Sequence, residues 1–364
     1  MRAVSNQSDG FKNSRRQSHL MELSLREEDI VKPSLLPYQE LEENVWLKNV
    51  CAGCRACISV CPAGTLAYDP ELNRPQQVTM CVECRACLDV CPRMPANIKN
   101  IGPSEILGPY LAVKNVRSKK NSGRFQNGGA VTALLTAAME EELVDCALVM
   151  GEDRWAQKSY PRVVYDVSDL EKCAGSKYTS NTVLEPIQDV IRNVNNIALV
   201  GTPCTVQAVG LLRKSSNEFA MKLAHKVRFL LGLFCFEAFS DQLIPEVTRR
   251  LCVPPWRIDK MSASDAMMTI SLRDGGIKTI PLPEISGYVK PGCKACADFT
   301  AKLSDVSVGG VGSTPGMSVV ILRTPEGVGL FKIAEERGFI EAKEGVKVEA
   351  IEKVGKLKLE RNGF

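Results

Sequence analysis

From about residue 110 onward, the chain alternates short apolar runs with longer stretches that have helical periodicity. The short runs are typical of buried strands. Residues 128–142 are rich in alanine and opened by two glycines, which predicts a helix, and a second helix is predicted from Cys204 to Leu212. Strands that alternate with helices indicate an α/β domain built on a mixed sheet. The predicted strands cover residues 111–116, 146–150, 197–200, 228–234, 269–272 and 318–322.

The chain before residue 110 has a different texture. Residues 1–46 predict an extension. Its first half is polar and expected to be disordered, and its acidic second half carries Leu35, Leu36, Leu41 and Trp46, which we expect to dock on the body or on a partner. Two Gly-Pro steps between residues 101 and 109 indicate a linker. We therefore predict three segments: 1–46, a cysteine-rich segment 47–108, and 109–364.

Composition narrows the class of protein. With 45% hydrophobic and 24% charged residues and a net charge of +4, the chain is typical of a soluble globular protein, and no nucleic-acid-binding face is indicated. Residues 1–20 have no signal-peptide pattern, and the longest apolar run, 229–239, is too short to span a bilayer. We expect a cytoplasmic protein, or one held by partners on the cytoplasmic side of a membrane complex. In that compartment fifteen cysteines suit metal ligation better than disulfides.

A twelve-residue pattern occurs twice, at 51–62 and 81–92, and each copy reads C-x2-C-x2-C-x3-C-P. This is the run that holds 4Fe–4S clusters in bacterial ferredoxins, where the fourth cysteine of each run ligates the other cluster. We therefore assign Cys51, Cys54, Cys57 and Cys91 to one cluster, and Cys81, Cys84, Cys87 and Cys61 to the other. The alternative is a pair of zinc sites, since C-x2-C also binds zinc. The run of three cysteines closed by C-P favours iron–sulfur clusters.

Seven cysteines lie outside these runs. Cys293 and Cys296 form a third C-x2-C, while Cys204 and Cys235 each follow a predicted strand. These four residues could converge at one sheet edge as a third four-thiolate site, or Cys204 and Cys235 could be small core residues. Spacing alone leaves both interpretations open. Cys146, Cys173 and Cys252 have no partner pattern, and we expect them in the core.

Seven segments resemble those of a known family, in the same order and over about residues 110–342: 127–132, 174–179, 202–207, 232–239, 292–299, 305–312 and 317–324. The family is the β subunit of coenzyme F420-reducing hydrogenase, with relatives that include the input subunit of F420H2 dehydrogenase, formate dehydrogenase β subunits and a plant chlorophyll-cycle reductase. The double cysteine run before this region is most similar to the arrangement in the F420H2 dehydrogenase input subunit, whereas the extension before Trp46 is a departure.

The resemblance implies a fold and a set of cofactors. The fold would be α+β or α/β, with a mixed-sheet flavin domain preceded by a bacterial-type two-cluster (2×4Fe–4S) ferredoxin-like domain. The flavin domain would bind FAD, exchange a hydride with coenzyme F420, and hold a third 4Fe–4S cluster. The family's cluster cysteines fall on Cys204, Cys235, Cys293 and Cys296.

Three glycine-containing segments are the candidates for FAD contacts. Glycines at the head of the helix at 128–142 suit a pyrophosphate at a helix N-terminus, the segment 175–179 offers a cation, hydroxyls and an aromatic ring, and the glycines at 309–312 permit close backbone approach. From sequence alone, each could equally be a turn or an ordinary surface loop. The candidates are Asn127, Gly128, Gly129, Thr132, Gly175, Lys177, Tyr178, Thr179, Gly309, Gly310 and Gly312.

Direct hydride transfer needs no acid or base from the protein, so no catalytic side chain is predicted. Arg154, Lys158 and Arg162 are either contacts for the anionic tail of coenzyme F420 or ordinary surface charges. The hypothesis is that reduced coenzyme F420 reduces FAD, which releases single electrons to the clusters. The expected acceptor is ferredoxin or a partner complex of the membrane-bound dehydrogenase, heterodisulfide-reductase or hydrogenase type. The alternatives are the same fold with a formate-linked or chlorophyll-cycle-like substrate, and a non-catalytic electron relay.

Overall fold

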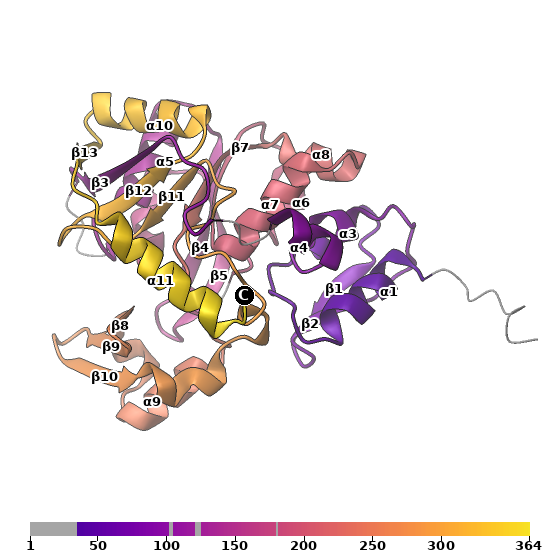
Figure 1. Ribbon diagram of the computed structural model, residues 1–364, viewed down its shortest axis with the longest axis horizontal. Coiled ribbons are helices and arrows are strands. Elements are labelled where there is room, and N and C mark those ends of the chain that lie inside the picture. Colours follow the sequence, from indigo (N-terminus) through magenta and orange to yellow (C-terminus); the bar gives the residue numbers. More distant parts are fainter. Residues whose placement is uncertain (1–34, 102–104, 121–124, 180) are drawn as a thin grey trace, which may run out of the picture. The chain divides into compact units, whose positions relative to one another are not determined.

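The computed structural model describes residues 35–101, 105–120, 125–179 and 181–364. After residue 110 its main feature is an eight-stranded mixed sheet (Figure 1). The strand order is β13-β3-β12-β11-β7-β6-β4-β5. The four central strands β11, β7, β6 and β4 are parallel, and the pairs outside them are antiparallel. The predicted mixed α/β architecture is therefore confirmed. The strands are β3 (Ala112–Ser118), β4 (Cys146–Asp153), β5 (Lys158–Val164), β6 (Ile197–Gly201), β7 (Val227–Leu233), β11 (Val306–Gly309), β12 (Ser318–Leu322) and β13 (Ile340–Lys343).

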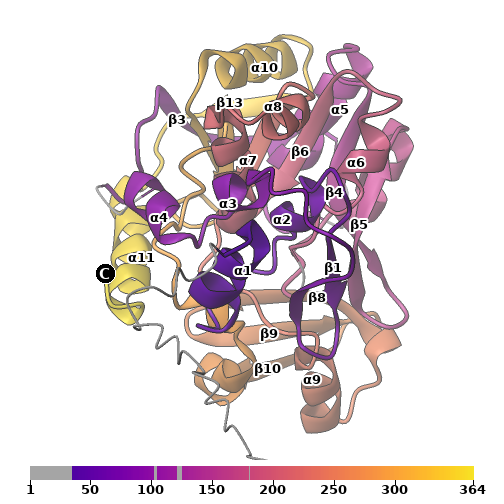
Figure 2. The same cartoon turned by 90° about the vertical axis from the view of Figure 1, so that its right-hand side faces the viewer.

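Helices cover both faces of this sheet, which is why its central strands are almost continuously apolar. Alternate residues belong to opposite cores: Leu148 and Leu199 pack on one face, whereas Val149 and Val200 pack on the other. The first face is covered by α6 (Ile187–Val190), α7 (Pro203–Lys214) and α8 (Glu218–Ala224). The second is covered by α5 (Ala130–Glu140) and α10 (Pro325–Glu336) (Figure 2).

A smaller antiparallel sheet, ordered β10-β9-β8, follows α9 (Leu243–Leu251). Its strands are β8 (Ile258–Ser264), β9 (Met267–Leu272) and β10 (Ile277–Pro281). Buried and half-buried residues alternate along β9, and its buried residues pack with Leu243 and Val247 of α9. The sequence pattern predicted only residues 269–272 of this sheet as a strand. The remaining elements of this part of the chain are η3 (Val167–Asp169), η4 (Glu171–Cys173), η5 (Pro255–Arg257), η6 (Leu282–Tyr288), η7 (Pro291–Cys293) and α11 (Val348–Arg361).

The two cysteine runs have matching backbones. Arg55 and Arg85 occupy the same position in each run and both have a φ of 59°, and each begins a short helix, α2 (Ala56–Ser59) or α3 (Ala86–Val90). Gly53 and Glu83 also match, with φ values of 69° and 56°. Glu83 holds a left-handed conformation that glycine adopts at lower cost. The other elements here are α1 (Pro37–Leu41), η2 (Glu42–Trp46), β1 (Leu66–Asp69), β2 (Arg74–Gln77) and α4 (Pro95–Ile101).

The compact unit begins at Leu36, eleven residues before the predicted domain start at 47. The reason is that Leu41, Val45 and Trp46 are buried in the core that also holds the cysteine runs. That core continues into residues of β4, β6 and α7, so the predicted segments 47–108 and 109–364 share buried contacts. The polar half of the predicted extension, residues 1–34, lies outside the described residues. Among the helices described, none combines the length and the apolar character needed to cross a bilayer.

Candidate iron–sulfur and flavin sites

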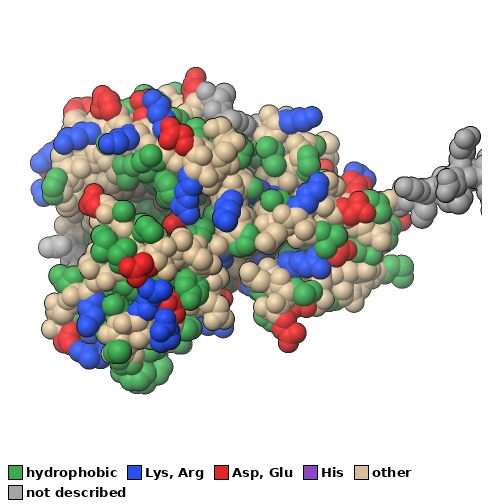
Figure 3. Space-filling view, turned by 60° about the horizontal axis from the view of Figure 1, so that its bottom comes forward, with side chains coloured by type: hydrophobic (Ala, Val, Ile, Leu, Met, Phe, Trp, Pro, Cys, Tyr) green, Lys and Arg blue, Asp and Glu red, His purple; other side chains and the backbone are tan. Residues whose placement is uncertain are grey.

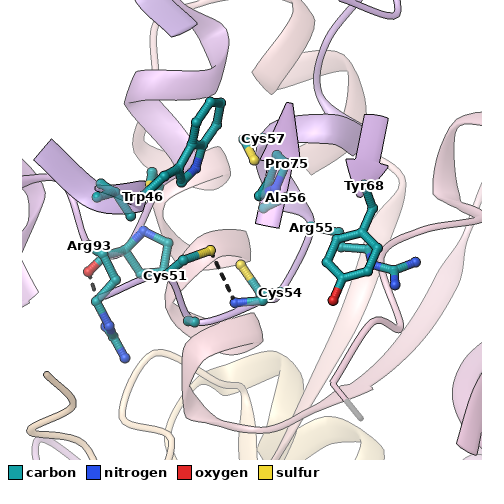
Figure 4. Close-up of a pocket in the computed structure, with 14 residues that line it drawn as sticks. Trp46, Cys51, Cys54, Arg55, Ala56, Cys57, Tyr68, Pro75 and Arg93 are labelled. Atoms are coloured by element: carbon teal, nitrogen blue, oxygen red, sulfur yellow. Dashed lines mark hydrogen bonds between the residues drawn. The ribbon is translucent and has the colours of Figure 1, made fainter. Parts of the chain in front are cut away.

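The structure sorts the eight cysteines of the repeat into two groups. The first, here called site 1, consists of Cys51, Cys54, Cys57 and Cys91, which line one pocket together with Trp46, Tyr68 and Arg93 (Figure 4). Cys57 lies close enough to Cys91, Cys51 and Cys54 for their charges to raise its pKa beyond the effect of burial. Burial is also the main cause that raises the pKa of Cys91 to about 12.

The second group, site 2, consists of Cys61, Cys81, Cys84 and Cys87, which line a separate pocket with Tyr38 and Thr65. Burial, reinforced by Cys61, Cys84 and Cys81, raises the pKa of Cys87 to about 12. The fourth cysteine of each run thus lies with the first three cysteines of the other run. This is the crossed arrangement that the spacing predicts for two cubane clusters.

Cys204, Cys235, Cys293 and Cys296 form a third group, site 3. Cys204 lies in the first turn of α7, directly after β6, and Cys235 follows the end of the neighbouring parallel strand β7. Because parallel strands end at the same edge of a sheet, these two cysteines meet there. Burial raises the pKa of Cys235, and the charges of Cys293, Cys204 and Cys296 add to that effect. All fifteen cysteines are free thiols.

Side chains from the C-terminal helix hold the Cys293–Cys296 loop. Asn362, which ends α11, donates from Nδ2 to the carbonyls of Cys293 (3.0 Å) and Cys296 (2.8 Å). Lys358 is 2% exposed and donates from Nζ to the carbonyls of Cys235 and Asp298, both at 2.7 Å. Neither residue was predicted, because nothing in a C-terminal amphipathic helix indicates that its last turns reach a cysteine loop.

Sites 1 and 3 are adjacent. Asn181 donates from Nδ2 both to Cys204 Sγ (3.0 Å) and to the carbonyl of Ala52 (2.9 Å), so one amide bridges the two sites. Site 2 adjoins site 1 on another side, where the charge of Cys87 contributes to the raised pKa of Cys57. The three groups therefore follow the order site 3, site 1, site 2.

The spacing of the thiols bears on the zinc alternative. In the described part of the chain, no three His, Cys, Asp or Glu side chains converge closely enough to hold a single metal ion. A four-iron cluster binds its four thiolates at separate corners of a cube and needs the wider spacing of a pocket lined by four cysteines. Sites 1 and 2 each bring four cysteines to one pocket, as a four-iron cluster requires.

Two of the predicted flavin segments meet at the carboxyl edge of the large sheet. Asn127 lies in the loop just before α5, and a Cβ atom added to Gly310, just after β11, would stand 2.4 Å from its Nδ2. At several of these positions the packing or the backbone conformation of the fold itself requires glycine. A Cβ atom at Gly128 would lie 2.4 Å from the carbonyl oxygen of Val116, and Gly129 caps α5 with a φ of 73°. Gly312 has a φ of 85°. Thr132 lies half-buried in the first turn of α5.

The third flavin segment, residues 175–179, faces β8. Tyr178 Oη accepts a hydrogen bond from the amide of Ala263 (3.0 Å), and burial is the main cause that raises its pKa. Thr179 is buried. Lys177 Nζ donates to the carbonyls of Cys173, Ala174 and Gly175 at 2.7–2.9 Å, which organises its own loop.

The first flavin segment also reaches β8. Lys260 Nζ donates to the carbonyl of Phe125 (2.7 Å), and Gln126 Nε2 donates to the carbonyl of Met261 (3.4 Å). In Figure 3 the surface is hollowed between the part built on the large sheet and the part built on β8–β10. Gln126 Oε1 is buried and accepts no hydrogen bond from any described residue. A buried acceptor beside Asn127 and an open helix N-terminus fit a cofactor that carries both donors and phosphates.

The remaining candidates have local partners. Cys146 is buried as predicted and Cys173 is half-buried, but Cys252 is exposed and was wrongly placed in the core, because it ends α9 in a left-handed conformation. Arg154 pairs with Asp259, and Arg162 pairs with Asp169 (2.6 Å). Both pairs are partly exposed, which agrees with ordinary surface charges.

The family comparisons agree with these groups. Residues 114–188 and 194–348 match the N-terminal and C-terminal parts of the coenzyme F420 hydrogenase/dehydrogenase beta subunit, and residues 45–92 match a 4Fe-4S dicluster domain. One of the F420H2 dehydrogenase subunits of Methanosarcina mazei is 31% identical over 330 residues, which covers 86% of this chain and 90% of that protein. The chain belongs to the family of coenzyme F420 hydrogenase/dehydrogenase beta subunits. It is an iron–sulfur member of that family, with an N-terminal dicluster domain.

Other members of this family extend the comparison. An uncharacterized protein of Methanocaldococcus jannaschii is 32% identical over 353 residues, 89% of this chain and 97% of that protein. Among solved structures, a chain of the F420-reducing NiFe hydrogenase complex of Methanosarcina barkeri matches with a TM-score of 0.66 and 28% identity, over 72% of this chain and 93% of that one. These relatives include subunits of F420-linked hydrogenase and dehydrogenase complexes.

Proposed function

We propose that this chain is the input subunit of an electron-transfer complex, which oxidises reduced coenzyme F420 and passes the electrons to a protein acceptor. It would hold FAD and three 4Fe–4S clusters, one at each cysteine site. FAD is the group that accepts a hydride and releases electrons one at a time, and 4Fe–4S clusters carry single electrons. The observation that supports this most strongly is the order of the sites, with site 3 between the flavin segments and site 1.

Two contacts connect the flavin segments to site 3. A Cβ atom on Gly309 would stand 2.0 Å from the ring of Phe234, the residue before Cys235. On the other side, the amide of Phe239 donates to the carbonyl of Tyr178 (2.8 Å), and the amide of the preceding residue, Ala238, donates to Cys293 Sγ (3.3 Å). The same short segment after β7 therefore contacts the candidate flavin loops, carries Cys235 and contacts Cys293.

Site 2 is the proposed exit. It lies at the opposite end of the series from the flavin segments, and exposed apolar side chains surround Cys81: Met80 is 82% exposed and Val82 is 58% exposed. Exposed apolar side chains beside a candidate cluster suit a docking partner that accepts electrons. The chain also matches 49% of the length of a coenzyme F420-dependent sulfite reductase at 32% identity. This match supports the proposal that the same kind of subunit delivers electrons to more than one type of acceptor.

An anaerobic donor screen tests the proposal. The purified protein is expected to contain FAD and about twelve iron atoms per chain, from three four-iron clusters. Mixing with reduced coenzyme F420 should bleach the flavin absorbance before the cluster absorbance. A protein that responds only to another donor would have the same fold with a different substrate. If gentle purification gives a protein that retains its iron but contains no flavin, the chain is a non-catalytic electron relay.

A further inference from the structure

The whole guanidinium of Arg93 is buried between sites 1 and 3. The residue is 4% exposed and follows Cys91 and Pro92 directly. Its Nη1 donates to the carbonyl of Pro92 (3.1 Å) and to Gln207 Oε1 (3.2 Å), and its Nε is buried without a partner among the described residues. Among the described residues, no carboxylate forms an ion pair with Arg93. A buried cation of this kind is strongly unfavourable unless anions compensate its charge.

The nearest compensating charges come from both sites. Arg93 lines the pocket of site 1 (Figure 4). Its hydrogen-bond partner Gln207 lies one turn after Cys204 of site 3 on α7, so the guanidinium also lies beside site 3.

Gln207 connects Arg93 to the far side of site 3. It accepts from Arg93 and donates from Nε2 to Asp298 Oδ2 (3.4 Å), and the Asp298 carbonyl accepts from Lys358 Nζ. Lys358 is the second buried cation here. Its Nζ also donates to the carbonyl of Cys235, a cysteine of site 3 (2.7 Å).

Site 2 differs from the other two sites. The cation that lines its pocket, Arg85, has a side chain that is 58% exposed and pairs with Glu40 (2.9 Å), so solvent and a carboxylate screen its charge. The two buried cations are therefore distributed unequally. Arg93 lies beside sites 1 and 3, Lys358 lies beside site 3, and neither of them lies beside site 2.

We propose that Arg93 is a shared counter-charge that stabilises the reduced states of the clusters at sites 1 and 3 together, whereas Lys358 stabilises site 3 alone. The physical reason is that reduction adds one negative charge to a cluster, and a fixed cation in a low-dielectric interior favours the more negative state. Because one guanidinium acts on both neighbours, it raises the reduction potentials of both clusters together. This inference rests on the proposed clusters at sites 1 and 3.

The test is a redox titration of the full-length, cluster-loaded protein, followed by electron paramagnetic resonance. Signals are assigned to sites with Cys91→Ser, Cys87→Ser and Cys296→Ser. In Arg93→Gln, we expect the reduced states at sites 1 and 3 to lose about tenfold in stability relative to the oxidised states, which for a one-electron couple is a potential lower by about 59 mV. Site 2 should not change. Arg93→Lys should restore most of the loss, and Lys358→Met should lower the potential of site 3 alone.

Unchanged potentials in Arg93→Gln, or equal shifts at all three sites, would overturn the proposal. If Arg93→Gln does not retain its clusters, Gln207→Glu provides the second test, because a carboxylate at the Nη1 partner offsets the guanidinium charge. Lowered potentials at sites 1 and 3 are then expected, and unchanged potentials overturn the proposal. A wild-type protein with about eight iron atoms and no signal from site 3 would contradict the proposed third cluster. In that case, the change in the reduction potential of site 1 in Arg93→Gln would still show whether Arg93 acts as a counter-charge.

Discussion

A Cβ atom on Gly292 would lie 2.1 Å from the carbonyl oxygen of Cys51. The loop that carries Cys293 therefore packs directly on the backbone of the first cysteine run, and only glycine permits this approach. Together with the bridge from Asn181 to Cys204 and Ala52, this contact makes sites 1 and 3 one continuous structure.

Gly292→Ala tests this contact. The added methyl group must push the two loops apart, and we expect a loss of about 1–3 kcal/mol in the free energy of unfolding, as for other overpacked positions. Electron transfer from site 3 to site 1 should also slow, which rapid-freeze spectroscopy after reduction would show. Gly287→Ala is the matched control, because a Cβ atom there meets no atom within 4 Å. Equal behaviour of the two variants would contradict the contact.

Single cysteine exchanges test the crossed grouping. Cys91→Ser and Cys51→Ser should remove the same cluster signal, because both residues belong to site 1, whereas Cys61→Ser should remove the signal that Cys81→Ser removes. Iron content should fall from about twelve to about eight atoms per chain in each case. If Cys91→Ser instead abolished the signal assigned through Cys81 and Cys84, each run would form its own cluster and the grouping would be wrong.

The flavin segments can be tested at Gly310. Gly310→Ala should displace the side chain of Asn127, whose Nδ2 stands 2.4 Å from the added Cβ atom. Since only one flexible amide has to move, we expect little change in stability but about a tenfold weaker affinity for FAD, the equivalent of about 1.4 kcal/mol. Gly329→Ala in α10, where a Cβ atom meets open space, is the control. Flavin titration of both variants, with iron content measured in parallel, gives the result, and a normal affinity for FAD in Gly310→Ala would exclude this loop from the flavin site.

The exit can be tested at Met80. Met80→Glu places a charge on the most exposed apolar side chain beside site 2 and should raise the KM for the protein acceptor several-fold. Reduction of the flavin and of all three clusters by reduced coenzyme F420 should proceed at the wild-type rate. Ile277→Glu changes a side chain that is 70% exposed on β10 and should leave the KM unchanged. Equal effects of the two substitutions would argue against docking at site 2.

Local spacing and periodicity in the sequence predicted much of this architecture. The C-x2-C-x2-C-x3-C-P runs predicted the grouping now seen at sites 1 and 2, and runs such as Ile197–Val200 predicted strands of the mixed sheet, because these patterns reflect contacts within a few residues. Site 3 was harder, since Cys204, Cys235 and Cys296 meet only after parallel strands align at one edge.

The buried cations could not be predicted. Arg93 and Lys358 lie 265 positions apart in the chain (358 − 93) and are connected through Gln207 and Asp298 only by tertiary packing, which leaves no local pattern. The sequence left open whether the apolar residues before residue 47 dock on the body or on a partner. These apolar residues, such as Leu41, are spaced on a helix that packs on the cysteine-rich core, whereas the acidic residues between them suggested a surface extension.

The most direct test of the central claim is anaerobic stopped-flow mixing of the loaded protein with reduced coenzyme F420. The account predicts rapid loss of flavin absorbance, followed by bleaching of the clusters and the appearance of three reduced-cluster signals. A protein that keeps its oxidised flavin and cluster spectra with this donor, but is reduced quickly by a different one, would contradict the claim that coenzyme F420 supplies the electrons.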